Sequence, residues 1–218
     1  MPSKSTDLAA EIIKTARSLS HKGLTAGHTG NVSARVKGGM LITPTGIPYE
    51  ELSDPEIVFV SNEGKWDKSH HAPSSEWQFH LSAYQANRAV KALVHCHSNY
   101  AITLACTGRS IPAFHYMVAA AGGHEIPLVP YAIFGSKKLS DYVATAFKQS
   151  KACLLAHHGQ LAGEKNLAKA LELAEIIEDL SHQYWAALQI GQPAILTRKQ
   201  MDDVIKKFKT YGQQQRRS

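Results

Sequence analysis

Apolar residues recur along this chain with two spacings, one typical of helices and one typical of buried strands. Near the start they return every three or four positions, which is the repeat of one helix face and predicts an amphipathic helix over residues 7–20. Further on, short apolar runs flanked by turn-forming residues predict buried strands at residues 40–42 and 57–60. The predicted helix face consists of Leu8, Ile12, Ala16 and Leu19.

The alternation of helix and strand patterns continues to the end of the chain. Three helices are expected to begin at capping side chains, which are a serine at 74 or 75, Asn166 and Thr197. Because there is no internal repeat or linker, we expect one α/β domain over residues 1–212 and a polar tail over residues 213–218. Taken alone, the alternation favours a parallel sheet. Further helices are expected over residues 98–107, 140–148, 166–189 and 197–209, and further extended segments over 90–97, 126–130 and 152–156.

Composition limits the possible classes of function. With 218 residues, 44% of them hydrophobic and 19% charged, the chain can bury a full core without disulfides or a structural metal. Its net charge of +6 is modest, and the basic stretch over residues 206–217 holds too few aromatic residues for a stacking platform, which argues against nucleic-acid binding. No stretch approaches the roughly 18 consecutive apolar residues of a membrane span, so no membrane partner is expected.

The cysteines and the first residues bear on the cellular compartment. Cys96, Cys106 and Cys153 are an odd number without the spacing of a metal or redox motif, a pattern typical of reduced thiols. Residues 1–7 lack the apolar core of a signal peptide. We therefore expect a cytoplasmic protein.

Histidine is the unusual feature of the composition, with twelve residues, several of them close together. His95 and His97 end a predicted strand, where side chains two positions apart point to the same side and can reach one metal ion. A hydrogen-bonded pair without a metal is the simpler alternative. A second pair, His157 and His158, also follows an apolar run, which indicates converging ligands, although the spacing does not choose between these two. Three imidazoles leave a coordination position open, as in catalytic zinc sites.

Glu76 stands at a predicted helix start beside Ser74 and Ser75. On its own, an acidic residue there does no more than stabilise the helix through its dipole. Serine hydroxyls and free backbone amides at a helix start also bind anions, however, and two turns offer further donors of this kind. No segment matches a nucleotide-binding fingerprint, but together they indicate a phosphate held near the metal. The donors in the two turns are Gly30, Asn31, Thr45 and Gly46.

Five short motifs follow one another in a specific order along the chain. They are Gly-Asn-Val-Ser at residues 30–33, Ile-Thr-Pro-Thr-Gly at 42–46, Pro-Ser-Ser-Glu at 73–76, His-Cys-His at 95–97 and His-His-Gly at 157–159. With these motifs the chain resembles the class II aldolase/ribulose-phosphate epimerase family over nearly its whole length. Segments 111–117, 130–135 and 208–212 resemble most closely the family members that cleave L-fuculose 1-phosphate.

The resemblance implies a fold and a metal site. The implied fold is a three-layer α/β sandwich with a central, mostly antiparallel sheet between helices, and this expectation replaces the parallel sheet. One zinc ion per subunit is implied, bound by three histidines and a glutamate, and the family's His-Gly motif selects His158 over His157. The implied ligands are Glu76, His95, His97 and His158, and the implied phosphate-binding residues are Gly30, Asn31, Thr45, Gly46, Ser74 and Ser75.

The activity that the resemblance implies is reversible cleavage of L-fuculose 1-phosphate into dihydroxyacetone phosphate and L-lactaldehyde through a metal-stabilised enediolate. Glu76, displaced from the metal, would carry the proton of the nucleophilic carbon. Tyr116 of a neighbouring subunit would serve the aldehyde oxygen, in a pocket shaped by Phe134 and Tyr211, within a homotetramer whose active sites lie near subunit interfaces. His28 departs from the family pattern, which places a smaller polar residue in this glycine-containing loop.

Two other functions are compatible with the same family. An L-ribulose-5-phosphate 4-epimerase, or another sugar-phosphate aldolase, would use the same metal and phosphate sites. The epimerase pattern includes an acid near residues 112–116, however, and this chain has none there. A non-catalytic scaffold like the aldolase-like head of adducin would have lost metal ligands, whereas this chain keeps all four.

Overall fold

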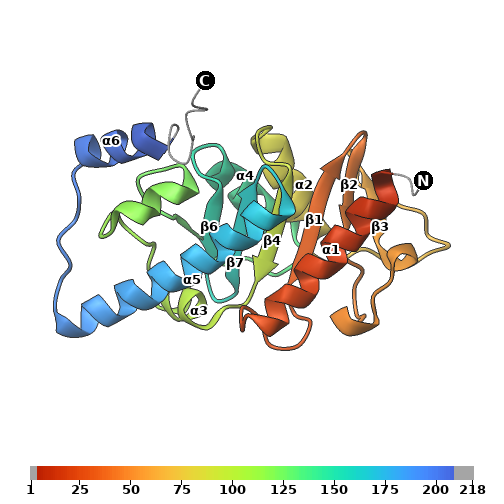
Figure 1. Ribbon diagram of the computed structural model, residues 1–218, viewed down its shortest axis with the longest axis horizontal. Helices are drawn as coiled ribbons and strands as arrows, with labels where there is room; N and C mark the ends of the chain where they lie inside the picture. The colour runs from red at the N-terminus through yellow and green to blue at the C-terminus, as the bar shows by residue number, and fades with distance from the viewer. Residues whose placement is uncertain (1–3, 209–218) are drawn as a thin grey trace, which may run out of the picture.

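A seven-stranded β-sheet forms the centre of the protein, whose computed structural model describes residues 4–208 (Figure 1). Its strands are β1 (Asn31–Val36), β2 (Gly39–Ile42), β3 (Val58–Ser61), β4 (Ala92–Cys96), β5 (Leu128–Val129), β6 (Ala152–Leu155) and β7 (Gly159–Glu164). They lie in the order β3-β2-β1-β4-β7-β6-β5, and each neighbouring pair is antiparallel except β5 and β6. The mostly antiparallel sheet is therefore confirmed, and the parallel sheet that alternation alone favoured is wrong.

Short connections explain two of the antiparallel pairs, β1 with β2 and β6 with β7. β1 and β2 are joined by the turn at residues 37–38, where Gly38 has a positive φ of 82°. β6 and β7 are joined by the turn at residues 156–158, where His157 has a φ of 57°. A parallel pair needs a crossover of a dozen or more residues, so connections this short permit antiparallel neighbours alone.

Helices cover both faces of the sheet, which makes a three-layer sandwich (Figure 1). The α-helices are α1 (Lys4–His21), α2 (Trp77–Ala86), α3 (Asn99–Cys106), α4 (Lys137–Phe147), α5 (Leu167–Ile190) and α6 (Arg198–Phe208), and the short 3₁₀ helices are η1 (Tyr49–Glu51), η2 (Asp54–Glu56) and η3 (Tyr116–Ala121). Val94 belongs to a buried cluster with α1, α3 and α5, whereas its neighbour Leu93 belongs to a second cluster with α2 and α4. Successive strand residues point to opposite faces, so one apolar run supplies both cores.

Two strands and one helix cap differ from the sequence-based expectations. β1 and β7 were not expected, because polar and glycine residues interrupt their apolar pattern, yet both lie in the middle of the sheet. The expected serine cap of α2 is wrong in its position: Glu76 occupies the N-cap position and makes no side-chain cap bond. A serine hydroxyl still accepts from a backbone N–H there, because the N–H of Glu76 donates to Ser74 Oγ at 3.4 Å. Asn166 caps α5 as predicted, because its side chain accepts a hydrogen bond from the Lys169 backbone.

The three central strands bring their ends together at one edge of the sheet. In the antiparallel register, Asn31 at the start of β1 lies opposite His95 near the end of β4. Cys96 at the end of β4 lies opposite Gln160 at the start of β7. Polar residues that are far apart in sequence therefore meet at this edge.

Two further expectations concern the whole chain. Cys96 and Cys153 are buried and Cys106 is exposed, and all three are free thiols. Within residues 4–208, no helix combines the length and the apolar composition needed to cross a bilayer. Tyr211, the expected boundary at residue 212 and the polar tail lie outside the described residues.

Candidate metal centre

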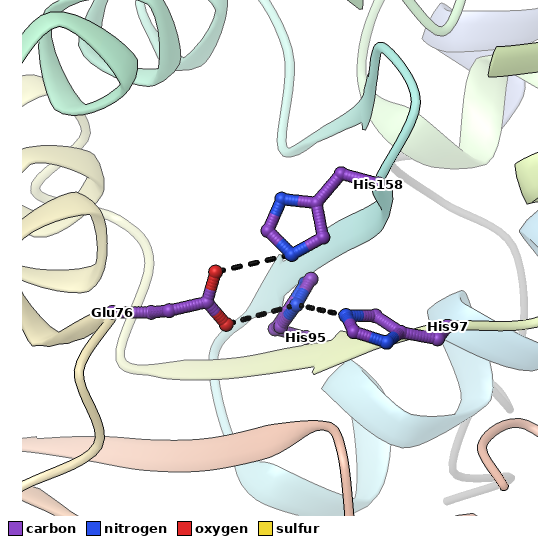
Figure 2. Close-up of side chains that lie close together, drawn as sticks. All are labelled: Glu76, His95, His97 and His158. Carbon is purple, nitrogen blue, oxygen red and sulfur yellow. Dashed lines mark hydrogen bonds and ion pairs between the residues drawn. The ribbon is translucent and has the colours of Figure 1, made fainter. Parts of the chain in front are cut away.

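Three imidazoles and one carboxylate converge at this edge of the sheet (Figure 2). His95 lies in β4, and His97 follows that strand. His158 lies in the turn before β7, and Glu76 occupies the N-cap position of α2. The Nε2 atom of His95 is 3.0 Å from His97 Nε2 and 3.1 Å from Glu76 Oε2. The Nε2 atom of His158 is 3.1 Å from Glu76 Oε1. Each of the four residues thus offers a ligand atom within 4.8 Å of the other three.

The donor set fits a divalent metal ion better than a hydrogen-bond network. Glu76 Oε1 is buried and has no properly oriented hydrogen-bond partner among the described residues, although His158 lies close to it. His95 and His97 turn the same ring nitrogen toward each other, an arrangement that at most one shared proton can satisfy. Four ligands at about 2.1 Å from a tetrahedral ion lie about 3.4 Å apart, which is close to the 3.0–3.1 Å separations of three of the pairs here. The four residues could therefore hold such an ion.

The turn before β7 separates the two consecutive histidines. His157 adopts a left-handed backbone conformation, and its ring packs edge-on against Tyr131 with centroids 6.0 Å apart. His158 instead faces His95 and His97, with ring centroids 4.8 and 5.0 Å away. His158 is thus the member of the pair that lies in the metal group.

Hydrogen bonds and burial set the protonation of the group. His95 Nδ1 donates to the backbone carbonyl of Gln160 at 2.8 Å, which leaves the lone pair of Nε2 facing the cluster. Burial, reinforced by His95 and His158, lowers the pKa of His97 to about 3. Burial would raise the pKa of Glu76. Electrostatic attraction and hydrogen bonding from His95 and His158 outweigh burial and hold this pKa well below its usual range. A neutral imidazole and an ionised carboxylate are the forms that bind metal ions.

The residues expected to bind phosphate lie around Glu76. Asn31 donates from its side-chain Nδ2 to Glu76 Oε2 at 2.9 Å, and both side chains are buried. Ser74 and Ser75 directly precede Glu76, the first buried and the second exposed. Gly30 packs so closely on β4 that a Cβ atom there would lie 2.4 Å from the carbonyl oxygen of His95.

The second turn is tied to the same segment by backbone hydrogen bonds. The N–H of Thr45 donates to Ala72 at 3.1 Å, and the N–H of Ser74 donates to Thr43 at 3.0 Å. Thr45 and Gly46 are both exposed at the tip of this turn. Backbone hydrogen bonds therefore tie the turn that carries Thr45 and Gly46 to the segment that leads to Glu76.

The two described residues expected at the aldehyde end of the substrate lie in different surroundings. The loop that carries Phe134 approaches the site, because a Cβ atom on Gly135 would lie 2.8 Å from the carbonyl oxygen of Ser75. Phe134 itself is 60% exposed. Tyr116 in η3 is 49% exposed, and its ring neighbours among the described residues are His115 and Phe208, which lie outside the metal group. Within residues 4–208, these ring contacts do not connect Tyr116 to His95, His97 or His158.

Several buried polar residues near the site were not singled out from the sequence. His80 bonds to Asn31, and Ser33 and Tyr84 continue this contact into the interior. His80 lies four positions after Glu76, so both face the same side of α2, and this spacing was the available signal. Gln160 acts through its backbone carbonyl, for which no side-chain pattern gives a signal.

Comparison with known proteins identifies a matching family model, similar proteins and a similar solved structure. A family model described as the class II aldolase and adducin N-terminal domain matches residues 10–185. An L-fuculose phosphate aldolase from Escherichia coli (strain K12) is 49% identical over 206 residues, which cover 94% of this chain and 95% of the relative. A 5-methylthioribulose-1-phosphate/5-deoxyribulose-1-phosphate aldolase from Rhodospirillum rubrum is 45% identical over 212 residues, which cover 97% and 96%. A solved structure of an L-fuculose 1-phosphate aldolase aligns with a TM-score of 0.90 and 37% identity, covering 96% of this chain and 98% of that one.

Proposed function

Because this chain belongs to the class II aldolase and adducin N-terminal domain family, we propose that it is a zinc-dependent aldolase that cleaves L-fuculose 1-phosphate. The reaction is reversible and gives dihydroxyacetone phosphate and L-lactaldehyde. The observation that carries the proposal is the convergence of four potential metal ligands near hydrogen-bond donors that could bind a phosphate. The four ligands are Glu76, His95, His97 and His158. A non-catalytic scaffold would have no use for four intact metal ligands.

A second candidate substrate is supported by the relative from Rhodospirillum rubrum, at 45% identity. Cleavage of any ketose 1-phosphate between C3 and C4 releases dihydroxyacetone phosphate, so the phosphate and metal sites can serve both reactions unchanged. The substrates differ in the aldehyde half, which is L-lactaldehyde from fuculose and a shorter aldehyde from a deoxyribulose. The choice between them therefore depends on the aldehyde pocket, where Phe134 and Tyr116 are expected.

Each residue of the site has a distinct role in this proposal. A zinc ion bound by the three histidines would supply the positive charge that stabilises the ketose oxygens as the carbon–carbon bond breaks. Glu76 shuttles the proton to and from the carbon that becomes the hydroxymethyl group of dihydroxyacetone phosphate, and its ionised form at neutral pH is the form that accepts a proton. Gly30, Asn31, Thr45, Gly46, Ser74 and Ser75 bind the phosphate.

Tyr116 completes the site from a neighbouring subunit in this proposal. Its side chain is half exposed, and its ring neighbours within residues 4–208 do not belong to the metal group. The exposed Phe134 lies on the loop beside Ser75. Contact between two copies would bring Tyr116 to the aldehyde oxygen, where a phenol can donate or accept the proton. We therefore expect a homotetramer with active sites near its interfaces, acting in the cytoplasm, with Tyr211 near the aldehyde pocket.

A substrate panel tests the proposal directly. Purified protein is analysed for metal, and release of dihydroxyacetone phosphate is then measured from L-fuculose 1-phosphate, L-rhamnulose 1-phosphate, 5-deoxyribulose 1-phosphate and 5-methylthioribulose 1-phosphate. The expected result is bound zinc and the highest kcat/KM with L-fuculose 1-phosphate, with His158→Ala as the inactive control.

Other outcomes would redirect the assignment. Preference for a deoxyribulose or methylthioribulose phosphate would leave the metal chemistry in place and change the aldehyde specificity. Interconversion of L-ribulose and D-xylulose 5-phosphates without triose release would identify an epimerase. Zinc-loaded protein inactive on every sugar phosphate would contradict the catalytic proposal.

A further inference from the structure

A continuous chain of hydrogen bonds leads from Glu76 into the core, away from the metal group. Asn31 Nδ2 is 2.9 Å from Glu76 Oε2, and Asn31 Oδ1 is 2.5 Å from His80 Nε2. His80 Nδ1 is 2.7 Å from Ser33 Oγ, and Ser33 Oγ is 2.8 Å from Tyr84 OH. The four residues beyond Glu76 are at most 3% exposed, so bulk water does not compete for these contacts.

The chemistry of the groups orients every proton in this chain. An ionised carboxylate is an acceptor, so Asn31 must present its NH₂ group to Glu76 and its carbonyl oxygen to His80. That carbonyl oxygen can only accept, so His80 must carry its proton on Nε2. His80 Nδ1 is then an acceptor, to which Ser33 donates, and the Ser33 oxygen accepts from Tyr84. In each of these hydrogen bonds, the acceptor is therefore the partner nearer to Glu76 along the series.

The inner end of the chain is fixed by its surroundings. The guanidinium of Arg35 lies 4.8 Å from the centre of the Tyr84 ring and hydrogen-bonds to the backbone carbonyl of Tyr84. His80 is stacked on Phe79, with ring centroids 5.0 Å apart. Burial also lowers the pKa of His80 to about 3, so the ring is neutral and a single tautomer can be selected.

We propose that His80 is a positioning residue that acts through Asn31, holding the amide with one N–H on the Glu76 carboxylate and the other toward the substrate phosphate. This proposal rests on the proposed function for the role of Glu76 and of the phosphate. Nδ2 of Asn31 carries two hydrogens and makes a single hydrogen bond within residues 4–208, so its second hydrogen is available to a ligand. A rotated amide would instead turn its oxygen toward the carboxylate and repel it.

The consequence is a link between the two halves of the site. If Glu76 leaves a bound metal ion when substrate enters, its hydrogen bond from Asn31 would still hold one carboxylate oxygen and keep the proton shuttle in place. The same amide contacts the phosphate, so substrate binding and base position share one side chain. His80 sets that side chain without touching substrate or metal.

The tautomer of His80 is the first test, and it needs no substrate. Long-range ¹H–¹⁵N NMR spectra of labelled protein, metal-free and zinc-loaded, would show which ring nitrogen bears the proton, with the resonance assigned by its loss in His80→Gln. The expected result is a neutral ring protonated on Nε2 in both forms. A proton on Nδ1, or on both nitrogens, at neutral pH would overturn the proposal, even if no sugar phosphate proved to be a substrate.

Two variants of His80 form the second test. His80→Gln keeps an N–H donor for Asn31 and an acceptor for Ser33, whereas His80→Leu has neither. In zinc-loaded protein, His80→Leu should lower kcat about 10–100-fold, the range typical of residues behind a metal ligand, while His80→Gln restores most of it. Leu81→Ala is a core substitution on the same helix at a residue that takes no part in these hydrogen bonds. It should lower stability and leave kcat unchanged.

The variants separate positioning from general damage. An unchanged kcat in folded His80→Leu, or an equal loss in Leu81→Ala, would contradict the positioning role. Failure of wild-type protein to cleave any sugar phosphate would instead contradict the proposed function, and the NMR result would still decide the orientation of the hydrogen-bond chain.

Discussion

The side-chain amide of Asn31 donates to the carboxylate of Glu76 at 2.9 Å, although the two residues lie 45 positions apart in the sequence. Asn31 begins a strand and Glu76 directly precedes a helix, so this contact joins an expected phosphate donor to the expected proton shuttle. A change at Asn31 therefore affects two functions, whereas a change at a peripheral phosphate donor affects one.

Removal of the Ser75 hydroxyl and removal of the Asn31 amide should change the kinetics in different ways. Ser75→Ala should raise KM for the phosphorylated ketose about 10-fold to 100-fold with little change in kcat, because a hydrogen bond to a charged group contributes about 1.5–3 kcal/mol. Asn31→Ala should raise KM similarly and also lower kcat, because Glu76 loses its partner. Ser18→Ala is the matched control, because Ser18 is half-buried in α1 and its hydroxyl donates to the Lys14 backbone carbonyl. Unchanged KM in both site variants would remove the phosphate assignment.

Metal content should distinguish the two consecutive histidines. His158→Ala removes one of three imidazoles from the group, so zinc measured after dialysis should fall together with activity. His157→Ala removes a ring that packs on Tyr131, and it should retain most of its zinc. Loss of zinc from the second variant and not from the first would show that the ligand assignment is wrong.

Glu76→Gln should separate metal binding from proton transfer. Glutamine keeps the size of the side chain but does not accept a proton at working pH, while three histidines remain for the metal. We expect zinc to be largely retained and kcat to fall about 10²–10⁴-fold, as is typical when a general base is lost.

Exchange of the hydroxymethyl proton of dihydroxyacetone phosphate into deuterated water provides a sharper measurement for the same residue. Wild-type protein should catalyse the exchange without aldehyde, and Glu76→Gln should not. Tyr116→Phe should retain exchange yet fail at cleavage, because its role is at the aldehyde oxygen. Rapid exchange in zinc-loaded Glu76→Gln would point to another base, and His115 would be examined next.

Gly30 should tolerate no side chain, for a reason separate from phosphate binding. A Cβ atom there would lie 2.4 Å from the backbone oxygen of His95, and backbone yields less readily than the end of a side chain. We expect Gly30→Ala to lower the free energy of unfolding by about 1–3 kcal/mol in urea titrations and to weaken zinc binding through displacement of His95. Gly191→Ala, where no atom lies within 4 Å, should leave both properties nearly unchanged.

The metal-free protein should lose stability as the pH falls from about 6.5 toward 3. Burial lowers the pKa of His80 and, with its histidine neighbours, that of His97 to about 3 from 6.5, so in this range the unfolded chain binds more protons than the folded one. Each histidine should contribute at most about 1.4 kcal/mol per pH unit to the slope of the unfolding free energy. The lowered pKa of Glu76 adds a further loss of stability as the pH falls below about 4.5.

Urea titrations across this pH range provide the measurement. His80→Gln should flatten the slope between pH 6.5 and 3, whereas His71→Gln, on an exposed loop, should leave it unchanged. A stability that rises on acidification would contradict the neutral, buried state of these histidines.

Local patterns in the sequence were enough for most of the secondary structure and for part of the site. The three-and-four repeat of Leu8, Ile12, Ala16 and Leu19 predicted α1, and the Asn166 cap predicted the start of α5, because helix faces and caps depend on neighbours within a few residues. The two-residue spacing of His95 and His97 placed both rings on one side of a strand end for the same reason.

The tertiary structure alone decided how distant residues meet. Strands β1 and β7 lack a strong apolar pattern of their own, and they form because their neighbours in the sheet supply the hydrogen bonds and the buried faces. The same pairing sets Asn31 opposite His95 and places the Gln160 carbonyl on the His95 ring, 65 positions away. The left-handed turn at His157 directs His158 into the metal group, and the buried path from Glu76 to Tyr84 exists only once a helix has packed on a strand. These relationships depend on sheet register and helix packing, which no local spacing encodes.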